Sequence, residues 1–126
     1  MRFKIGFLII SLAMSSCANG AHSIFWSRGK EVPLPRSNPA LSLYRNKLVL
    51  AGGNDLAGAT NTVQLFHVRR QKWEEGPALA KARFAAAAVS YQKRVVVLGG
   101  YGRDKEILRS GESYTRGGWK AHPPML

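Results

Sequence analysis

Two stretches of the sequence end alike: residues 47–53 read KLVLAGG, and residues 94–100 read RVVVLGG. Each is a short apolar run closed by two glycines, which is typical of a β-strand buried on both faces and followed by a turn. The two stretches start 47 residues apart. This spacing predicts a structural unit that is repeated along the chain.

Further residues recur at nearly the same interval. Trp26, Trp73 and Trp119 are separated by 47 and 46 residues. Internal similarity with a period of about 20 to 50 residues is the signature of repeat folds such as solenoids and propellers. The other matches at a shift of 47 are Arg36 with Arg83, Ala40 with Ala87, Tyr44 with Tyr91, and Gly52-Gly53 with Gly99-Gly100.

Each repeat is predicted to form four antiparallel strands. The first strands are expected at 40–44 and 84–91 and the second at 47–51 and 94–98, joined by tight polar turns at 45–46 and 92–93. In the first repeat, residues 62–66 alternate with period two and predict a third strand, and residues 71–74 predict a short fourth one. The alanine-rich segment 78–88 has helix propensity, but its register with 35–44 favours a strand.

This pattern resembles the Kelch repeat, in which a strand ends in Gly-Gly and is followed by an aromatic residue and then a tryptophan. Gly52-Gly53, Phe66 and Trp73 have the Kelch spacing, with seven residues from Phe66 to Trp73, whereas Tyr114 and Trp119 are only five residues apart. The resemblance covers residues 26 to 126 and implies an all-β fold, a Kelch-type β-propeller fragment. We expect about two four-stranded antiparallel blades, at 36–82 and 83–126, plus one ring-closing strand near 24–34.

The repeated glycines and aromatics are interpreted as packing residues. Glycine permits positive φ and close approach of two strands, and large aromatic rings fill the wedge between neighbouring blades. The residues given this structural role are Trp26, Trp73, Trp119, Gly52, Gly53, Gly99, Gly100, Phe66 and Tyr114.

The N-terminus has the pattern of a secretory signal peptide. Arg2 and Lys4 precede an apolar run over residues 5–14, which is followed by small residues. Two kinds of signal-peptide cleavage fit this sequence. The tetrapeptide at 14–17 resembles a lipobox with Cys17 as the lipidated residue, and Ala18-Asn19-Gly20 fits ordinary cleavage. Residues 1–20 are therefore expected to be a leader and 21–126 the mature propeller part, located in the periplasm, the cell envelope or the medium.

The composition is strongly basic, with a net charge of +12 that falls to +10 once Arg2 and Lys4 are removed. The basic residues are scattered singly or in pairs, and the chain is expected to be exported, so nucleic acid is not an expected partner. An acidic glycan or an acidic protein ligand fits better, and a solvated surface without a partner is the alternative. Membrane contact is expected only through a lipid on Cys17.

The Kelch resemblance implies ligand candidates at one end of the propeller channel. Arg36 and Arg83 each precede a first strand, and a guanidinium there can hold a carboxylate with two hydrogen bonds. Loops between second and third strands open onto the same end, which adds Asn54, Asp55, Arg103 and Lys105.

The sequence contains no motif for a metal, a cofactor or covalent catalysis. His22, His67 and His122 lack the i+4 partners of a metal site. Residues 53–60 have glycines at the spacing of a phosphate loop, but Ala59 stands where that motif has lysine. No catalytic residue or cofactor is therefore predicted.

Three functional hypotheses follow. The first is an exported, non-catalytic binding module. The second, resting on fold analogy with exported bacterial Kelch proteins, is an N-acetylneuraminate (sialic acid) mutarotase or epimerase. The third is a truncated propeller that does not function alone and needs further blades or self-association, because two blades leave apolar faces and strand edges uncovered.

Overall fold

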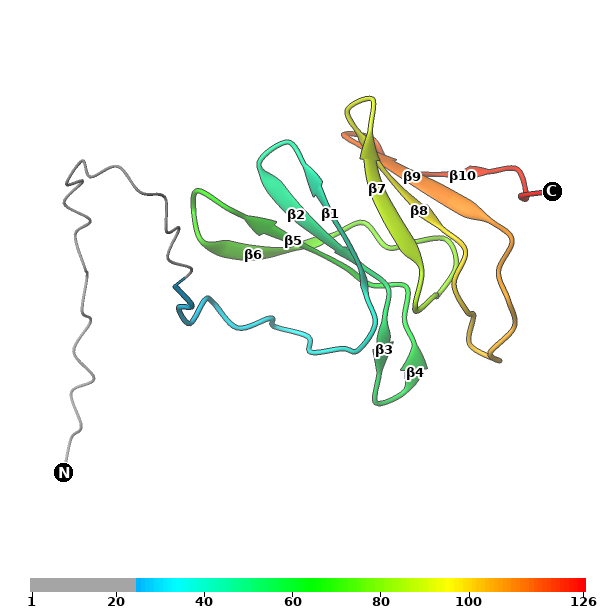
Figure 1. Ribbon diagram of the computed structural model, residues 1–126, viewed down its shortest axis with the longest axis horizontal. Coiled ribbons are helices and arrows are strands. Elements are labelled where there is room, and N and C mark those ends of the chain that lie inside the picture. Colours follow the sequence, from blue (N-terminus) through cyan, green and yellow to red (C-terminus); the bar gives the residue numbers. More distant parts are fainter. Residues whose placement is uncertain (1–24) are drawn as a thin grey trace, which may run out of the picture.

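The computed structural model describes residues 25–126 and contains strands but no helix in that range (Figure 1). No helix of the described part is long and apolar enough to cross a membrane. The signal peptide and the lipidation of Cys17 fall in residues 1–24, outside the described residues, and stay predictions.

The first blade is a four-stranded antiparallel sheet with the order β1-β2-β5-β6. Its strands are β1 (Ala40–Tyr44), β2 (Lys47–Ala51), β5 (Val63–His67) and β6 (Lys72–Gly76). The first two strands pair through a two-residue turn at 45–46, with Leu43 opposite Leu48. Arg45 has φ of 55°, as such a tight hairpin turn requires.

The second blade repeats this topology as β7 (Ala87–Tyr91), β8 (Arg94–Leu98), β9 (Gly111–Thr115) and β10 (Gly118–His122). Its first turn is also two residues long, and Gln92 and Lys93 both have positive φ. The last turn, between β9 and β10, spans two residues, whereas the corresponding turn between β5 and β6 spans four. This difference accounts for the shorter spacing from Tyr114 to Trp119.

The two blades differ most in the loop between the second and third strands. In blade 1 this loop contains a small hairpin of β3 (Asn54–Asp55) and β4 (Gly58–Ala59). In blade 2 the equivalent loop forms isolated bridges, in which Tyr101 pairs with Phe84 and with Ile107. The aromatic rings of Phe84 and Tyr101 stack with centroids 5.5 Å apart.

The core lies between the blades, which are joined side by side by residues 77–86 (Figure 1). β1 of blade 1 contacts β7 and β8 of blade 2. Buried residues come from both sheets and from the linker, and they include Val49, Val63, Leu79, Val95 and Val97. Complete removal of such side chains from water stabilises the packed pair by about 1.5–3 kcal/mol each.

The all-β fold with two four-stranded antiparallel blades is confirmed. The alanine-rich segment is linker and strand rather than helix: Ala87 and Ala88 pair with β8, and the residues before them belong to the linker. The expected ring-closing strand near 24–34 is not formed in the described residues, and Trp26 is 95% exposed. A single strand needs a neighbour for its backbone groups, and no described strand pairs with this segment.

Candidate functional site

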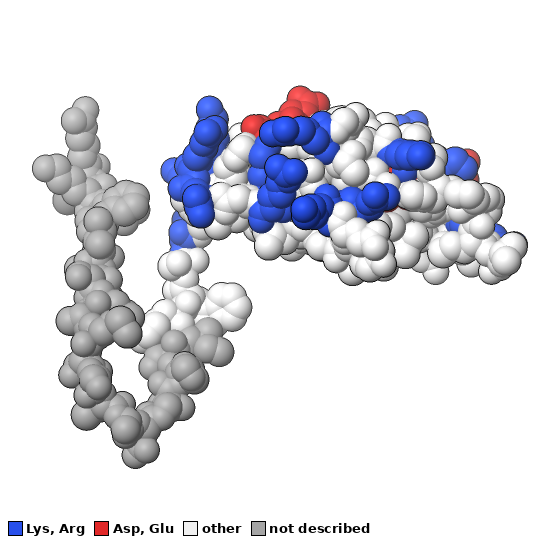
Figure 2. All heavy atoms as spheres, turned by 90° about the horizontal axis from the view of Figure 1, so that it is seen from above, with Lys and Arg blue, Asp and Glu red and all other residues white. Residues whose placement is uncertain are grey.

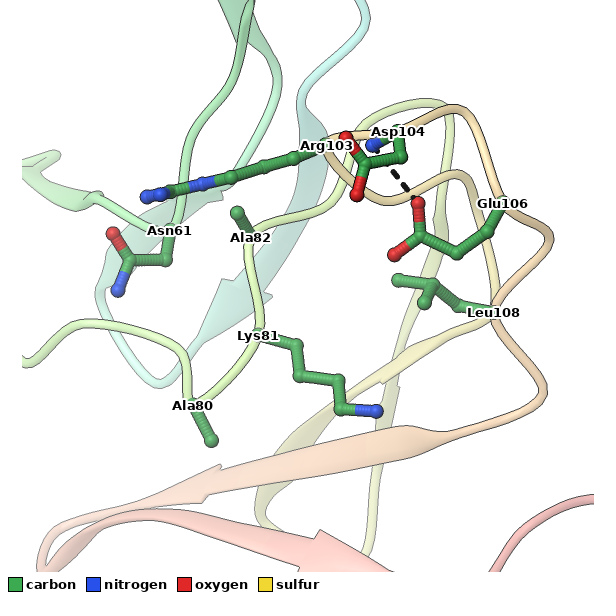
Figure 3. A pocket seen from close by; sticks show the side chains of 8 residues that line it. All are labelled: Asn61, Ala80, Lys81, Ala82, Arg103, Asp104, Glu106 and Leu108. Atoms are coloured by element: carbon green, nitrogen blue, oxygen red, sulfur yellow. Dashed lines mark hydrogen bonds between the residues drawn. The ribbon is translucent and has the colours of Figure 1, made fainter.

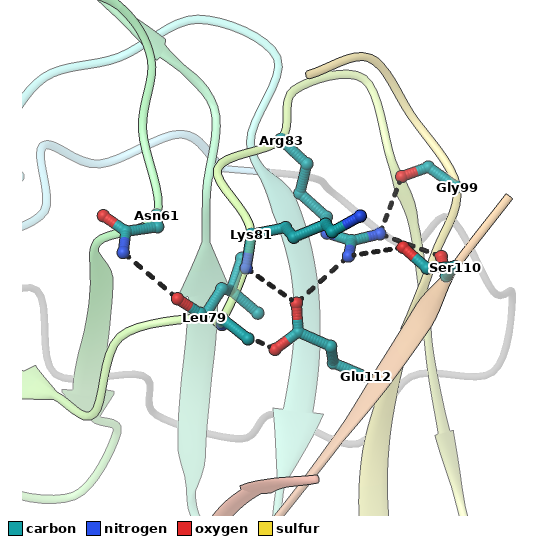
Figure 4. A network of polar contacts seen from close by, with 8 residues as sticks. Asn61, Leu79, Lys81, Arg83, Gly99, Ser110 and Glu112 are labelled. Atoms are coloured by element: carbon teal, nitrogen blue, oxygen red, sulfur yellow. Dashed lines mark hydrogen bonds and ion pairs between the residues drawn. The ribbon is translucent and has the colours of Figure 1, made fainter. Parts of the chain in front are cut away.

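Arg83 is the centre of a buried polar network that joins the linker to blade 2 (Figure 4). Its Nη1 donates to the carbonyl oxygens of Gly99 and Ser110, at 2.9 and 3.0 Å. Its Nη2 donates to Glu112 Oε1 at 3.0 Å and to Ser110 Oγ at 3.3 Å. Arg83 is 1% exposed. We call this arrangement the Arg83 clamp.

Glu112 completes the Arg83 clamp from the third strand of blade 2. Its carboxylate also accepts hydrogen bonds from the backbone N–H groups of Ala80 and Lys81, at 2.8 and 3.2 Å. A buried carboxylate is costly unless it is paired and hydrogen-bonded, and Glu112 has both kinds of partner. The clamp therefore fixes the path of the linker against blade 2.

Arg36 makes the equivalent clamp in blade 1. Its Nη1 donates to the carbonyl oxygens of Gly52 and Thr62, both at 3.0 Å, and its Nη2 donates to Gln64 Oε1 at 3.2 Å. Gly52 and Gly99 are equivalent, and Gln64 stands where blade 2 has Glu112. Arg36 is only partly buried. Burial lowers its pKa, and the nearby Asp55 carboxylate opposes that shift.

These clamps change the role expected for the two arginines. Both precede a first strand, at equivalent places of their blades. The guanidinium of Arg83 is enclosed by protein atoms, so it is not available to a ligand, contrary to the expectation from sequence. The carboxylate that it holds is Glu112 of the same chain. Arg36 lies at the edge of a hollow of about 330 Å³, but both of its Nη atoms donate hydrogen bonds to protein acceptors.

The first diglycine lies where the linker closely approaches blade 1. Gly52 has φ of 62°, and a Cβ added there would overlap the carbonyl oxygen of Arg83 in the linker. The backbone N–H of Gly53 donates to that same oxygen at 2.8 Å. Gly99 and Gly100 also have positive φ, of 65° and 86°.

The repeated aromatic pairs lie on the third and fourth strands of each blade. Phe66 packs on Trp73 with ring centroids 4.9 Å apart, and Tyr114 packs on Trp119 at 5.2 Å. Tyr114 also meets Tyr44 of blade 1 edge to face at 5.2 Å, which places it in the interface between blades. Burial raises the pKa of Tyr114.

The remaining candidates lie at the loop end of the blades. Asn54 pairs through its backbone with Ser37, and Asp55 Oδ1 accepts the N–H of Ala57 at 2.8 Å to order the β3–β4 turn. Arg103 lines a hollow of about 240 Å³ together with Asp55. Lys105 is exposed beside it in sequence, with φ of 60°.

A cavity of about 450 Å³ also lies at this loop end, between the linker and the 101–109 loop (Figure 3). Arg103 extends over Ala82 toward Asn61, whereas Lys81 extends the other way and ends below Leu108 in this view. Two acids share the rim, and Glu106 is turned back to the N–H of Asp104 at 3.0 Å. The cavity is therefore mixed in charge, and no described group of His, Cys, Asp or Glu is placed to hold a metal ion.

Comparisons with known proteins agree with this geometry. No family model matches the chain. An F-box/kelch-repeat protein of Arabidopsis thaliana is 31% identical over 94 residues, which is 71% of this chain and 22% of that protein. The two sheets are Kelch-type propeller blades. Kelch-like protein 38 of Homo sapiens is 28% identical over 62% of the chain, and Kelch-like protein 40 of Xenopus tropicalis is 25% identical over 68%. The matched part spans 14% of each of these two.

The opposite end of the Kelch blades is strongly basic (Figure 2). The four two- to four-residue turns at this end join β1 to β2, β5 to β6, β7 to β8 and β9 to β10. The turns of blade 1 are tied together, because the N–H of Val68 donates to the Asn46 carbonyl at 3.1 Å. We call this surface the hairpin end. Its exposed cations are Arg45, Arg69, Arg70, Lys72, Lys93, Arg94 and Arg116.

A hollow of about 170 Å³ lies between the two blades at the hairpin end. Arg45 lines it from blade 1, and Lys93 and Arg94 line it from blade 2. The guanidinium of Arg45 lies 5.6 Å from the centroid of the Tyr44 ring, a cation–π contact that orders it.

Sequence reasoning missed two features of these surfaces. The first is Glu112, whose signal is that Gln64 and Glu112 match at a shift of 48 rather than 47. The second is the hairpin end, whose cations belong to turns that are far apart in sequence. The sequence did contain a signal for the hairpin end. Alternate turns of an antiparallel sheet lie at the same end, so the cations of these turns could have been grouped once both blades were considered together.

Proposed function

We propose that this chain is a non-catalytic interaction module that binds an acidic segment of a partner protein at its hairpin end. The observation that supports this most directly is the hollow lined by Arg45, Lys93 and Arg94, with cations from both blades. None of the described residues in the four turns of this end is acidic. The similarity to Kelch-repeat proteins is consistent with a protein-interaction role.

The electrostatics favour the hairpin end over the loop end. Glu74 follows Lys72 on β6, and its oxygens lie 2.6 Å from Lys47 Nζ and 2.8 Å from His67 Nε2, so its charge is already paired. At the loop end, Asp104 and Glu106 offset the charge of Lys81 and Arg103. A cluster of cations without acids between them attracts a negative segment and speeds its association.

The test compares two variants of the full chain with equal charge. One replaces Arg45, Lys93 and Arg94 by alanine, and the other replaces Lys81, Arg103 and Lys105. Fluorescence anisotropy with a labelled oligo-glutamate peptide measures the affinity. We expect the first variant to weaken binding by about tenfold or more, equal to about 1.4 kcal/mol, and the second to change it far less. Equal losses would mean that net charge alone binds the peptide.

A heparin oligosaccharide serves as the second probe, because an acidic glycan is the other ligand class that fits a basic surface. Tighter binding of heparin than of the peptide, with the same dependence on Arg45, Lys93 and Arg94, would assign the site to a glycan. The sialic acid mutarotase or epimerase hypothesis still rests on fold analogy.

Export is a second part of the proposal, supported by the N-terminal sequence. Mass spectrometry of fractionated cells tests it. We expect a product outside the cytoplasm that lacks the first residues up to 16 or 20. An intact cytoplasmic product that retains Met1 would contradict export and leave the binding test unaffected.

A further inference from the structure

Each Kelch blade has two faces, because alternate residues of a strand point to opposite sides of the sheet. The forward face of blade 1, which includes Ala40, Tyr44, Val49 and Leu65, is buried against blade 2. The face of blade 2 that meets it includes Val95, Val97 and Tyr114, and we call this the rear face. The interface is therefore formed by a forward face on a rear face.

One face of each blade has no neighbour within the described chain. Leu41 and Leu43, on the rear face of blade 1, are 54% and 49% exposed. Val89 and Tyr91, on the forward face of blade 2, are 51% and 60% exposed. The chain thus presents a rear face at one side and a forward face at the other.

The two exposed faces differ from the joined faces in a matched way. In the interface, Ser42 Oγ and Ser90 Oγ are 2.8 Å apart. Val89 is the repeat equivalent of Ser42, and Leu43 is the equivalent of Ser90. The two serines that meet in the interface thus correspond to two apolar residues on the exposed faces. This is the expected change if Leu43 and Val89 meet in the same way.

The aromatic contact between blades has an equivalent on the exposed faces too. Tyr44 and Tyr114 meet edge to face in the interface. Their equivalents are Tyr91 on the forward face of blade 2 and Phe66 on the rear face of blade 1. A rear face set on this forward face would pair Phe66 with Tyr91.

The tryptophan of blade 1 has a donor without an acceptor. Trp119 Nε1 donates to the carbonyl of Pro77, at the start of the linker, at 2.8 Å. Trp73 is the equivalent residue, and its buried Nε1 has no hydrogen-bond partner among the described residues. The repeat equivalent of Pro77 is Pro123, at the end of β10.

The segment after β10 already has the conformation of the linker. Leu79 N donates to Asn61 O at 2.8 Å, and the equivalent Met125 N donates to Arg109 O at 2.7 Å. Leu79 is buried between the blades, whereas Met125 is 42% exposed. Met125 is thus placed to enter an interface in the way that Leu79 does.

Charge adds to this match. Arg94 and Lys120 lie on the forward face of blade 2, at the places that Lys47 and Glu74 occupy in blade 1. The rear face of blade 1 bears Glu75 and no cation on its strands. A basic forward face and an acidic rear face attract one another.

We infer that a second copy of this chain covers each exposed face, so that copies join head to tail, the rear face of blade 1 on the forward face of blade 2. A head-to-tail interface closes into a ring when its rotation permits. Propeller rings hold about four to eight blades, so about two to four copies of this two-blade chain would close one ring.

The test uses two single variants of the full chain, Leu43→Glu and Val89→Glu, each of which blocks one face. Light scattering after size exclusion measures the mass at physiological salt. We expect the unmodified chain to run as one closed species of two to four copies, and each variant alone to run as a monomer. A one-to-one mixture of the variants has one intact face of each kind, so it forms a heterodimer and stops there.

Controls keep this test decisive. Leu56→Glu changes an exposed apolar residue of the β3–β4 turn, outside both faces, and is expected to keep the assembly. Circular dichroism must show an unchanged β spectrum for each variant. If Leu43→Glu unfolds, Leu41→Glu replaces it on the same face, and if Val89→Glu unfolds, Tyr91→Glu replaces it. A monomeric unmodified chain, an open range of masses, variants that keep the mass, or folded variants that do not pair when mixed would each overturn the inference.

Discussion

The Arg36 clamp of blade 1 and the Arg83 clamp of blade 2 use the same atoms in different surroundings. Each guanidinium binds the carbonyl of a glycine at the end of the second strand and a carbonyl at the start of the third. Arg83 is enclosed by the neighbouring blade and faces a carboxylate, whereas Arg36 is partly exposed and faces an amide. The repeat therefore determines which hydrogen bonds form, and the neighbouring blade determines how much these bonds contribute to stability.

The largest difference is expected from removing the two arginines. Arg83→Ala leaves the carboxylate of Glu112 buried without its ion-pair partner, which costs about 3–5 kcal/mol. Arg36→Ala breaks bonds between a partly exposed cation and neutral acceptors, and it costs about 1–2 kcal/mol. Urea unfolding followed by tryptophan fluorescence, at one protein concentration, gives both free energies.

A double variant checks the cause of the larger loss. Arg83→Met with Glu112→Gln removes the charge together with its partner, so it should recover a good part of the stability lost in Arg83→Ala. Equal losses in Arg83→Ala and Arg36→Ala would show that the neighbouring blade adds nothing to the clamp.

The diglycines offer a second, smaller contrast. Alanine at either Gly52 or Gly99 is strained by the positive φ, at about 1–2 kcal/mol. At Gly52 the new Cβ also overlaps the Arg83 carbonyl, whereas at Gly99 the nearest atom is the Leu108 carbonyl oxygen at 3.5 Å. Gly52→Ala should therefore lower the midpoint of thermal unfolding clearly more than Gly99→Ala. The reverse order would place the tight contact between blades elsewhere.

The smallest contrast concerns Glu74 and its dependence on pH. Hydrogen bonds from Lys47 and His67 lower the pKa of Glu74 below its ordinary value. A group with a lowered folded pKa adds stability above its unfolded pKa and loses it as the pH falls through the folded pKa. Because the carboxylate is partly exposed, the effect is at most about 1 kcal/mol. Blade 2 has Lys120 at this position and no such pair.

Glu74→Gln should therefore reduce the loss of stability on acidification, measured as urea midpoints at neutral and acidic pH. Asp104→Asn is the matched control, since the Asp104 carboxylate lies outside both exposed faces and has no hydrogen bond or ion pair among the described residues. If the two variants have the same acid profile, the contact of Glu74 with Lys47 does not contribute to stability.

Much of the strand plan was predictable because it depends on short-range pattern. The first strand of blade 1 and both second strands fall at the predicted residues, since an apolar run between a polar turn and a diglycine has few other structures. The strand expected at 84–91 begins at Ala87 instead, because Phe84 bridges to Tyr101 in the neighbouring loop. The segment near Trp26 formed no strand, because a strand depends on its neighbour.

The candidate site was less predictable for a physical reason. Arg83 donates to backbone carbonyls, and because every residue has one, the side-chain pattern of the sequence does not predict these bonds. The burial of Glu112 follows from contact with a linker some 30 residues away in sequence. A surface such as the hairpin end exists only once both blades are placed, although its individual cations are plain in the sequence.

The position of each clamp has a consequence for how this protein can change. Arg36 Nη1 bonds the carbonyls of Gly52 and Thr62, which are the two ends of one loop, and Arg83 does the same for Gly99 and Ser110. The base of the loop is thus fastened independently of what lies between. The loops already differ by one residue and by conformation while the strands on either side stay in register. Insertions at 54–60 or 101–108 can therefore accumulate with little cost to the blades, since longer surface loops add only slowly to the entropy of closure.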